Sequence, residues 1–531
     1  MNDFINAINF NGMTLTENGA LTNMSTGSEL MDQFGKAGNY RDRNIDDVFF
    51  DQKAIWEEDA DKALRFPFYL RMITRKVKVN DNITTEKVQM GQGVRDEAFK
   101  RLLWISTYHP DVFYKNIWVL PLVGSWKDLW TLLYYDKALG VNSLKKDIIF
   151  EVINHGLACS AHVELIKKFM PRIKSNGKCK TIWTQITNQL AKDFANYNKM
   201  SYEDYNHIKT SGTAHDFQKI ICEKRYKDII WDRIPGRALN LLVSGGFIKK
   251  HNLEKMFMDW ILANPTAKFT GYVYELGKKV IDGIRSNAPM YKKIVWDRQF
   301  DELIRKAQDG GKIKSNVWCA IDTSGSMAEE VVKNITAYDI CISLGVFFST
   351  LNQGAFHNQV IMFSDESRAK ELRGSFGDKI RQIVTSETAW GSTNFMSIVE
   401  EIARIRKNNP NIPLKDYPTT ILVVSDMQFN PSSRCKSTNY EDAKNVLKEV
   451  FPHDWVDDLK FIWWDCTSRR TDFPATLNDN GCYFLSGFDG SIISMICGED
   501  AKDKDESKSL SMEDIINKAL NQEILNYIQL T

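Results

Sequence analysis

Hydrophobic residues between Asp51 and about Tyr291 recur at the three- and four-residue spacing of amphipathic helices. The spacing predicts a long series of helices, including segments at 144–157, 161–169, 180–195, 239–249, 253–262 and 272–285. A polar stretch at 75–93 interrupts the series, and we interpret it as an exposed loop between two helices. Helices in series without an exact sequence period favour a degenerate helical-repeat solenoid.

The pattern changes at Gly310-Gly311, after which short apolar runs alternate with helical segments. Strands are predicted at 316–321, 359–363, 419–425, 459–465 and 482–485, and helices at about 328–350, 395–407 and 439–450. Residues 421–424 are Ile-Leu-Val-Val, a continuous apolar run that is typical of a central parallel strand. This alternation predicts an α/β domain with a parallel sheet and helices on both faces.

A chain of 531 residues is too long for one hydrophobic core, so we expect more than one domain. The patterns above divide the chain into four parts. Residues 1–50, rich in Asn, Gly, Thr and Asp, are expected to be irregular and packed on the body. Residues 51–311 form the helical domain and 312–498 the α/β domain. Residues 499–531 contain a charged linker and a final amphipathic helix that packs back on the body.

The net charge of +1 conceals an asymmetry along the chain. Residues 161–300 carry 25 Lys and Arg against 13 Asp and Glu, a net charge of +12, whereas residues 312–531 carry 23 against 31, a net charge of −8.

Two basic clusters lie in the helical part: Lys167, Lys168, Arg172, Lys174, Lys178 and Lys180, and then Lys219, Lys224, Arg225, Lys227, Arg233 and Arg237. Phe169, Trp183, Tyr226 and Trp231 lie among them. Basic groups that neutralise phosphates and aromatic rings that stack on unpaired bases predict RNA binding. Two alternatives are that these basic residues form a solvated helix face, or that the basic helical part docks on the acidic domain.

A group of small oxygen-bearing side chains follows the first strand of the α/β domain. Asp322, Ser324 and Ser326 are two residues apart directly after the apolar run at 316–321, so their side chains can point the same way. Thr393, before a predicted helix, and Asp426, at the end of the central strand, are the further candidates at the same sheet edge. Oxygen ligands of this kind suit a hard divalent cation, with Mg²⁺ expected and Mn²⁺ or Ca²⁺ as alternatives.

These five residues, in this order, resemble the metal-ion-dependent adhesion site of von Willebrand factor A domains. The resemblance implies that Ser324, Ser326 and Thr393 bind the cation directly and that Asp322 and Asp426 act directly or through water. It also implies a sixth coordination position that stays open for an acidic group of a protein partner. With few anionic ligands the cation remains electron-poor, which favours an external carboxylate or phosphate.

The helical part resembles the TROVE and DUF2828-type families, whose best-known relative is the Ro 60 kDa autoantigen. The matching segments are 16–20, 25–27, 56–59, 63–65, 68–71, Gly91-x-Gly93-x-Arg95, Gly124-x-Trp126-x-Asp128-Leu129 and 168–172. The resemblance implies a HEAT-like helical-repeat ring followed by an A domain, and it makes RNA the first partner to test.

No motif supports catalysis, since His-Glu-x-x-His, a Walker loop and Gly-x-Ser-x-Gly are all absent from the sequence. We therefore expect a non-catalytic RNA-binding scaffold whose A domain binds a divalent cation and a partner. The alternative is a metal-dependent protein-interaction or structural assembly component without RNA. Nine cysteines without a Cys-x-x-Cys pair and the lack of a signal peptide predict a cytoplasmic protein with no membrane partner. The sequence leaves the oligomeric state open.

Overall fold

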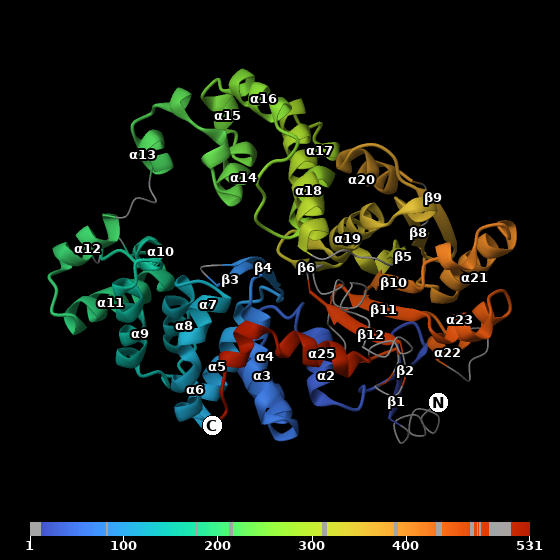
Figure 1. Cartoon of the computed structure of the whole chain (residues 1–531), viewed down its shortest axis with the longest axis horizontal. Helices are drawn as coiled ribbons and strands as arrows, with labels where there is room; N and C mark the ends of the chain where they lie inside the picture. Colours follow the sequence, from blue (N-terminus) through green and yellow to red (C-terminus); the bar gives the residue numbers. More distant parts are fainter. Residues whose placement is uncertain are drawn as a thin grey trace. The chain divides into compact units, whose positions relative to one another are not determined.

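The computed structural model describes residues 12–80, 83–175, 179–211, 216–310, 316–386, 391–431, 438–467, 472–474, 476, 479, 481–487 and 511–531. The chain forms two compact units: unit 1 comprises Met1–Tyr40 and Ile230–Lys518, and unit 2 comprises Arg41–Ile229 and Ala519–Thr531. The predicted helical region and the predicted C-terminal α/β sheet are both present (Figure 1). The four domain ranges given above stay predictions.

Unit 1 contains a six-stranded sheet (Figure 1). Its strands are β5 (Val317–Asp322), β8 (Gln359–Phe363), β9 (Ser367–Glu371), β10 (Thr420–Ser425), β11 (Lys460–Asp465) and β12 (Cys482–Ser486). The order across the sheet is β12-β11-β10-β5-β8-β9, and only β9 runs antiparallel to its neighbour. The sheet is therefore mixed, not wholly parallel as predicted. The three residues between β8 and β9 are too few for a crossover, so the two strands form a hairpin.

The strand order creates a switch point between β5 and β10. From β5 the chain continues to β8 and β9 on one side and then returns to β10, β11 and β12 on the other. Connections of opposite direction leave a crevice at the carboxyl ends of the two middle strands, where α/β proteins bind ligands. Every residue of β5 and β10 is buried, as expected for central strands. The topology thus selects the carboxyl ends of β5 and β10 as the place to look for a site.

The helices of unit 1 differ from the predicted ones at two places. The helix predicted at 328–350 begins only at Ala337, as α19 (Ala337–Leu351), because β6 (Glu330–Val332) and β7 (Ile335–Thr336) form a hairpin before it. The Thr336 side chain caps α19 by accepting a hydrogen bond from Asp339 N. Helix α18 (Met290–Gly310) extends the helical region well past Tyr291. The other helices of unit 1 are α14 (Gly236–Ser244), α15 (Phe247–Lys250), α16 (Glu254–Ala263), α17 (Val273–Arg285), α20 (Phe376–Val384), α21 (Phe395–Asn408), α22 (Asn439–Lys448) and α23 (His453–Asp457).

The described part of the N-terminal segment is structured, so the prediction of an irregular segment is wrong there. Strands β1 (Met13–Leu15) and β2 (Leu21–Asn23) form an antiparallel hairpin, and helix α2 (Glu29–Lys36) follows and packs on β12. Asn23 also forms an antiparallel bridge with Phe473. These elements are not apparent from the sequence, because each is short and polar and is stabilised by contacts with other parts of unit 1.

Unit 2 is mainly helical. Its helices include α3 (Ile45–Glu58), α4 (Ala60–Arg71), α5 (Asp96–Tyr108), α6 (Pro110–Asn116), α7 (Leu120–Val123), α8 (Lys127–Ala138), α9 (Lys146–Ala158), α10 (Val163–Phe169), α11 (Ile182–Tyr197), α12 (Tyr202–Thr210) and α13 (Asp216–Cys222). The exposed loop predicted at 75–93 is wrong: β3 (Arg75–Asn80) and β4 (Ile83–Gln89) form an antiparallel hairpin. The alternation of Lys and Val at 76–79 is a strand signal that the helical surroundings obscured. Among the described residues no helix is long and apolar enough to span a bilayer.

A buried ion-pair cluster joins three segments of unit 2. The Arg71 guanidinium lies 2.6 Å from Asp128 Oδ2, and Arg95 Nε lies 3.5 Å from Asp128 Oδ1. Asp128 also accepts a hydrogen bond of 2.7 Å from Ser125 N, in the turn before α8. Arg71, Arg95 and Asp128 come from the three segments 68–71, 91–95 and 124–129 that carry the resemblance to the TROVE-type families. In this chain those segments build a structural centre.

Candidate metal centre

The side chains of Asp322, Ser324 and Ser326 meet at the carboxyl end of β5. Ser324 N donates a hydrogen bond of 2.8 Å to Asp322 Oδ1, and the two serine hydroxyl oxygens are 3.1 Å apart. Asp322 and Ser324 are buried, whereas Ser326 is exposed. Adjacent ligands of an octahedral Mg²⁺ ion are about 3 Å apart, given metal–oxygen distances of about 2.1 Å. The two hydroxyls therefore have a separation that suits neighbouring positions around one cation.

Backbone hydrogen bonds bring the other two loops to this place. Gly325 N donates to Gly391 O at 3.2 Å, and Asn430 N donates to Thr393 O at 2.8 Å. The Thr393 loop is thus tied both to the serine loop and to the segment after β10, and the Thr393 side chain is buried. Gly391 lets the Asp365 carboxylate lie directly against the backbone of this loop, since a Cβ at residue 391 would force that carboxylate to move. The three loops form one edge of the sheet at the switch point.

Asp322 and Asp426 are buried carboxylates that repel each other. Burial raises the pKa of Asp322, and the charge of Asp426 raises it further. Burial likewise raises the pKa of Asp426, while a hydrogen bond from Ser326 opposes the shift. Neither carboxylate has an ion pair with Lys, Arg or His within the described part of the chain. Two buried like charges without a positive partner create a local negative potential that favours a cation.

The five residues fit a divalent cation with oxygen ligands. Ser324, Ser326 and Thr393 provide hydroxyl oxygens, and the two carboxylates provide the negative charge. In the residues that the structure describes, no three His, Cys, Asp or Glu side chains cluster as a metal site, which agrees with a set that contains only two acids. Such a set would leave the cation incompletely neutralised. A bound cation would then attract an outside carboxylate or phosphate oxygen.

Three neighbouring residues take part in this edge but were not predicted from the sequence. The Ser425 hydroxyl donates to Asp322 Oδ2 at 2.5 Å and fixes that carboxylate. Gln428 N donates to Asp426 Oδ1 at 3.1 Å. Asp465 ends β11 and its charge raises the pKa of Asp426 further. The signal for Asp465 was available, since an acid directly after a buried strand is the same pattern that identified Asp322 and Asp426.

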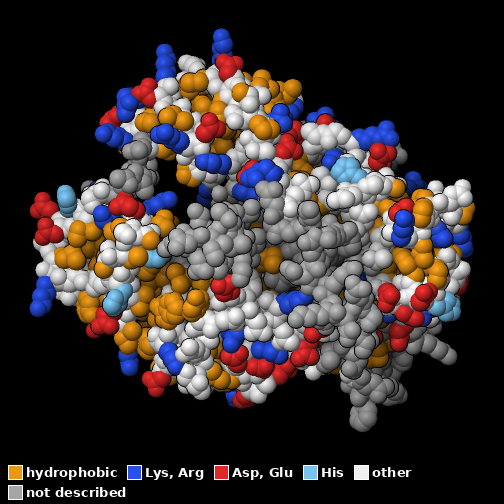
Figure 2. Space-filling view, in the orientation of Figure 1, with side chains coloured by type: hydrophobic (Ala, Val, Ile, Leu, Met, Phe, Trp, Pro, Cys, Tyr) orange, Lys and Arg blue, Asp and Glu red, His pale blue; other side chains and the backbone are white. Residues whose placement is uncertain are grey.

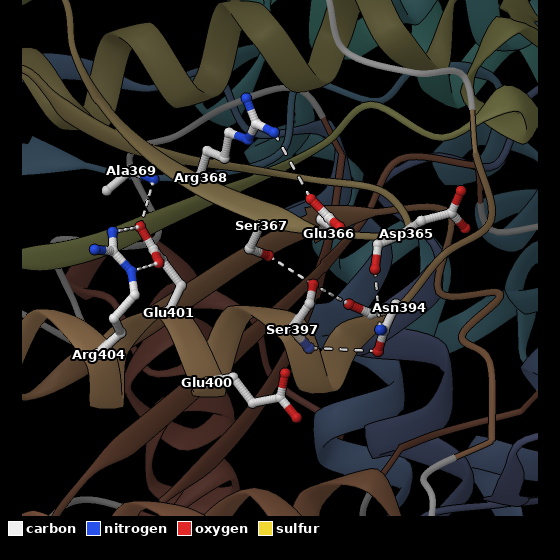
Figure 3. Close-up of a pocket in the computed structure, with 10 residues that line it drawn as sticks. All are labelled: Asp365, Glu366, Ser367, Arg368, Ala369, Asn394, Ser397, Glu400, Glu401 and Arg404. Carbon is white, nitrogen blue, oxygen red and sulfur yellow. Dashed lines mark hydrogen bonds and ion pairs between the residues drawn. The ribbon is translucent and has the colours of Figure 1, made fainter.

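A pocket of about 550 Å³ adjoins the Thr393 loop (Figure 3). Residues of the β8–β9 turn, β9 and α21 line it: Asp365, Glu366, Ser367, Arg368, Ala369, Asn394, Ser397, Glu400, Glu401 and Arg404. Asp365 accepts a hydrogen bond of 2.8 Å from Ser392 N and another from the Ser392 hydroxyl, and these bonds lower its pKa. Asp365 thus anchors the Thr393 loop through Ser392.

The basic residues predicted to bind RNA are divided between the two units. Lys167 to Lys227 belong to unit 2, whereas Arg233 and Arg237 belong to unit 1. Figure 2 shows Lys and Arg side chains scattered among hydrophobic ones over α14–α16 of unit 1. Lys178 lies outside the described residues. From the sequence these residues form two continuous clusters. The border between the units at Ile230, which divides the second cluster, is not visible in the sequence.

Ion pairs separate the basic residues of unit 2 into two kinds. Arg225 is bound by Glu223 at 2.8 Å and by Asp228 at 2.7 Å, and Lys167 lies 3.3 Å from Glu164. Lys168, Arg172, Lys174 and Lys180 are exposed and form no ion pair with a described residue. Lys224 and Lys227 share this property. The positive charge available to a ligand therefore comes from Lys168, Arg172, Lys174 and Lys180 and from Lys224 and Lys227.

Two comparisons relate the chain to known proteins by sequence. Residues 316–527 match the model of a domain of unknown function, DUF7788, and this range contains all five candidate cation ligands. The chain is 22% identical over 525 residues to the uncharacterized protein L728 of Acanthamoeba polyphaga mimivirus, which covers 91% of this chain and 84% of that protein. Neither similarity assigns an activity.

A solved structure resembles most of the chain at low identity. The crystal structure of the Deinococcus radiodurans RO (RSR) protein matches 93% of this chain and 99% of that chain, with 13% sequence identity and a TM-score of 0.44.

Proposed function

We propose that this protein is a non-catalytic binding scaffold whose unit 1 carries a von Willebrand factor A-type domain with a divalent cation site. Asp322, Ser324, Ser326, Thr393 and Asp426 would hold the cation, Mg²⁺ in the first instance. When bound, the cation would offer a free coordination position to a carboxylate of a partner. The observation that supports this proposal best is the meeting of two unneutralised buried carboxylates and two adjacent hydroxyls at the sheet's switch point.

Mn²⁺ is the probe that tests this proposal, because its electron paramagnetic resonance reports binding and the relaxation of water protons reports bound water. We expect one Mn²⁺ per chain, competition by Mg²⁺, and a fall in proton relaxation when acetate displaces the bound water. Thr393→Val, which removes only the hydroxyl, should weaken Mn²⁺ binding by at least about tenfold, the effect usual for a group in a metal site. Thr393→Ser is the matched control and should bind normally. Absence of Mn²⁺ binding by the wild-type chain would refute the proposal.

RNA binding by unit 2 is the second function that we propose. It is supported by the exposed basic side chains without ion pairs at Lys168, Arg172, Lys174 and Lys180. Burial and the charge of Arg172 lower the pKa of Lys209. The Lys209 ammonium group donates hydrogen bonds to the carbonyls of Lys167 and Lys168 in α10, so several positively charged residues lie close together here. A phosphate backbone would relieve this repulsion. We also propose that the helices have a HEAT-like ring arrangement and that this helical part is the one that binds RNA.

The ion pairs predict unequal effects of charge removal on RNA binding. The double variant Lys168→Glu/Arg172→Glu should weaken binding of a structured RNA with a single-stranded end. It should also reduce the slope of log affinity against log salt by about 2, one for each lost phosphate contact. Arg225→Gln should have a much smaller effect than Lys168→Gln, because Glu223 and Asp228 already neutralise Arg225. Gel-shift titrations over a range of salt concentrations measure both quantities. Equal losses in the two Gln variants would contradict the assignment.

A further inference from the structure

The N-terminal hairpin of unit 1 contacts the segment that follows Asp426. The buried Thr16 hydroxyl donates a hydrogen bond of 2.6 Å to Phe429 O and accepts one of 2.9 Å from Ala20 N. Asn18 Nδ2 donates to Gln428 O at 2.5 Å. Glu17 N donates to the Gln428 side chain at 2.8 Å. Three successive residues of the turn between β1 and β2 are thus hydrogen-bonded to residues 428–429, more than 400 positions away in the sequence.

Gln428 connects this turn to the candidate cation ligand. Its backbone N–H donates to Asp426 Oδ1, while its carbonyl and its side chain are held by the turn. Met427, between the two residues, has a φ of 64°, a left-handed conformation that a methionine adopts only when its surroundings hold it. The segment from Asp426 to Phe429 therefore depends on external contacts for its conformation.

The same N-terminal segment also holds the neighbouring strand end. Lys36 Nζ lies 3.0 Å from Asp465 Oδ2 and donates to Asp472 O at 3.2 Å, and both members of the ion pair are buried. Thr22 Oγ1 donates to Phe473 O at 2.8 Å. Residues 16–36 are therefore bound to the segments that follow β10 and β11, two adjacent strands of the sheet.

We propose that the N-terminal hairpin positions Asp426 for cation binding, with Thr16 and Asn18 as positioning residues that act through residues 427–429. This inference rests on the cation site proposed above. Hydrogen-bonded neighbours that orient a metal ligand commonly change metal affinity tenfold to a hundredfold when they are removed. The N-terminal segment is accordingly a functional part of the C-terminal site and not only a cover for it.

Mn²⁺ titration of full-length variants tests the inference by electron paramagnetic resonance. Thr16→Val keeps the shape of the side chain and removes both hydrogen bonds of the hydroxyl. Asn18 is exposed, and Asn18→Ala removes its hydrogen bond to Gln428 O. Each should weaken Mn²⁺ binding by about tenfold and alter the spectrum of the bound ion. Thr16→Ser retains the hydroxyl and should restore wild-type affinity. Asn18→Ala serves if Thr16→Val does not fold.

Thr22→Val is the matched control, because Thr22 is equally buried on the same hairpin but bonds Phe473 instead of the Asp426 segment. It should lower thermal stability as Thr16→Val does and leave Mn²⁺ affinity unchanged. Wild-type affinity in both Thr16→Val and Asn18→Ala, or an equal loss in Thr22→Val, would overturn the inference. A wild-type chain that binds no Mn²⁺ would refute the cation site itself, and with it any positioning role. These results are distinguishable from one another.

Discussion

Asp322→Asn is expected to abolish Mn²⁺ and Mg²⁺ binding and, at the same time, to make the cation-free protein more stable than the wild type. The cation loses a negative charge that three hydroxyls and one remaining carboxylate do not replace. In the cation-free protein, the substitution removes one of two buried charges of the same sign. The hydrogen bond from Ser324 N to residue 322 is retained by the Asn oxygen, and the Ser425 hydroxyl, which donates to Asp322 Oδ2, can turn to accept one from the Asn amide.

Thermal unfolding with and without Mg²⁺ measures this prediction. Without cation, the melting temperature of unit 1 should rise in Asp322→Asn. At a Mg²⁺ concentration 100 times the dissociation constant the wild type should gain about 2.7 kcal/mol and the variant nothing, so the order of stability should reverse. Asp416→Asn removes an equal charge from an exposed position before β10, at the opposite end of the strand, and should change neither quantity. A variant that is less stable without cation, or that still binds Mn²⁺, would contradict the two-carboxylate description.

Asp128→Asn is expected to destabilise unit 2 by about 3–5 kcal/mol, because it removes the carboxylate that pairs with the buried Arg71 guanidinium. Arg71 and Asp128 are both almost fully buried, so water cannot replace the lost interaction. Such a loss is a large part of the stability of a typical domain. Denaturant unfolding followed by hydrogen exchange in α4 and α8 measures the effect where it arises.

The double variant Arg71→Met/Asp128→Leu distinguishes charge burial from loss of packing. It removes both charges, and replacement of a buried ion pair by apolar residues is often neutral or stabilising. It should therefore recover most of the stability lost in Asp128→Asn. Asp136→Asn is the control: this buried acid on the same helix accepts hydrogen bonds from Ser143, and the substitution should cost about 1 kcal/mol. A loss in Asp128→Asn no larger than in this control would show that the ion pair is dispensable.

Local sequence patterns predicted the elements that bear the candidate site. The apolar runs of β5 and β10 are buried strands because the continuous hydrophobic residues at 317–321 and 421–424 suit a sheet covered on both faces. The strand-end rule then placed Asp322 and Asp426 at one edge, because carboxyl ends of parallel strands meet there. The apolar pattern missed β9, because its charged residues Arg368, Lys370 and Glu371 give little apolar signal at a sheet edge. It also missed β3 and β4, because the neighbouring helices dominated the pattern.

The sequence by itself determined which side chains could bind a cation, since the identity of the donors and their position after a strand are local properties. Only the tertiary structure decided that Ser425 and Gln428 orient the two carboxylates, that Lys36 neutralises Asp465, and that Thr16 and Asn18 hold the segment after Asp426. It also decided that Arg225 is neutralised by its neighbours while Lys168 and Arg172 are not. Hydrogen bonds and ion pairs depend on distances of a few ångströms. Between residues hundreds of positions apart those distances are set by the path of the whole chain, about which a local pattern carries no information.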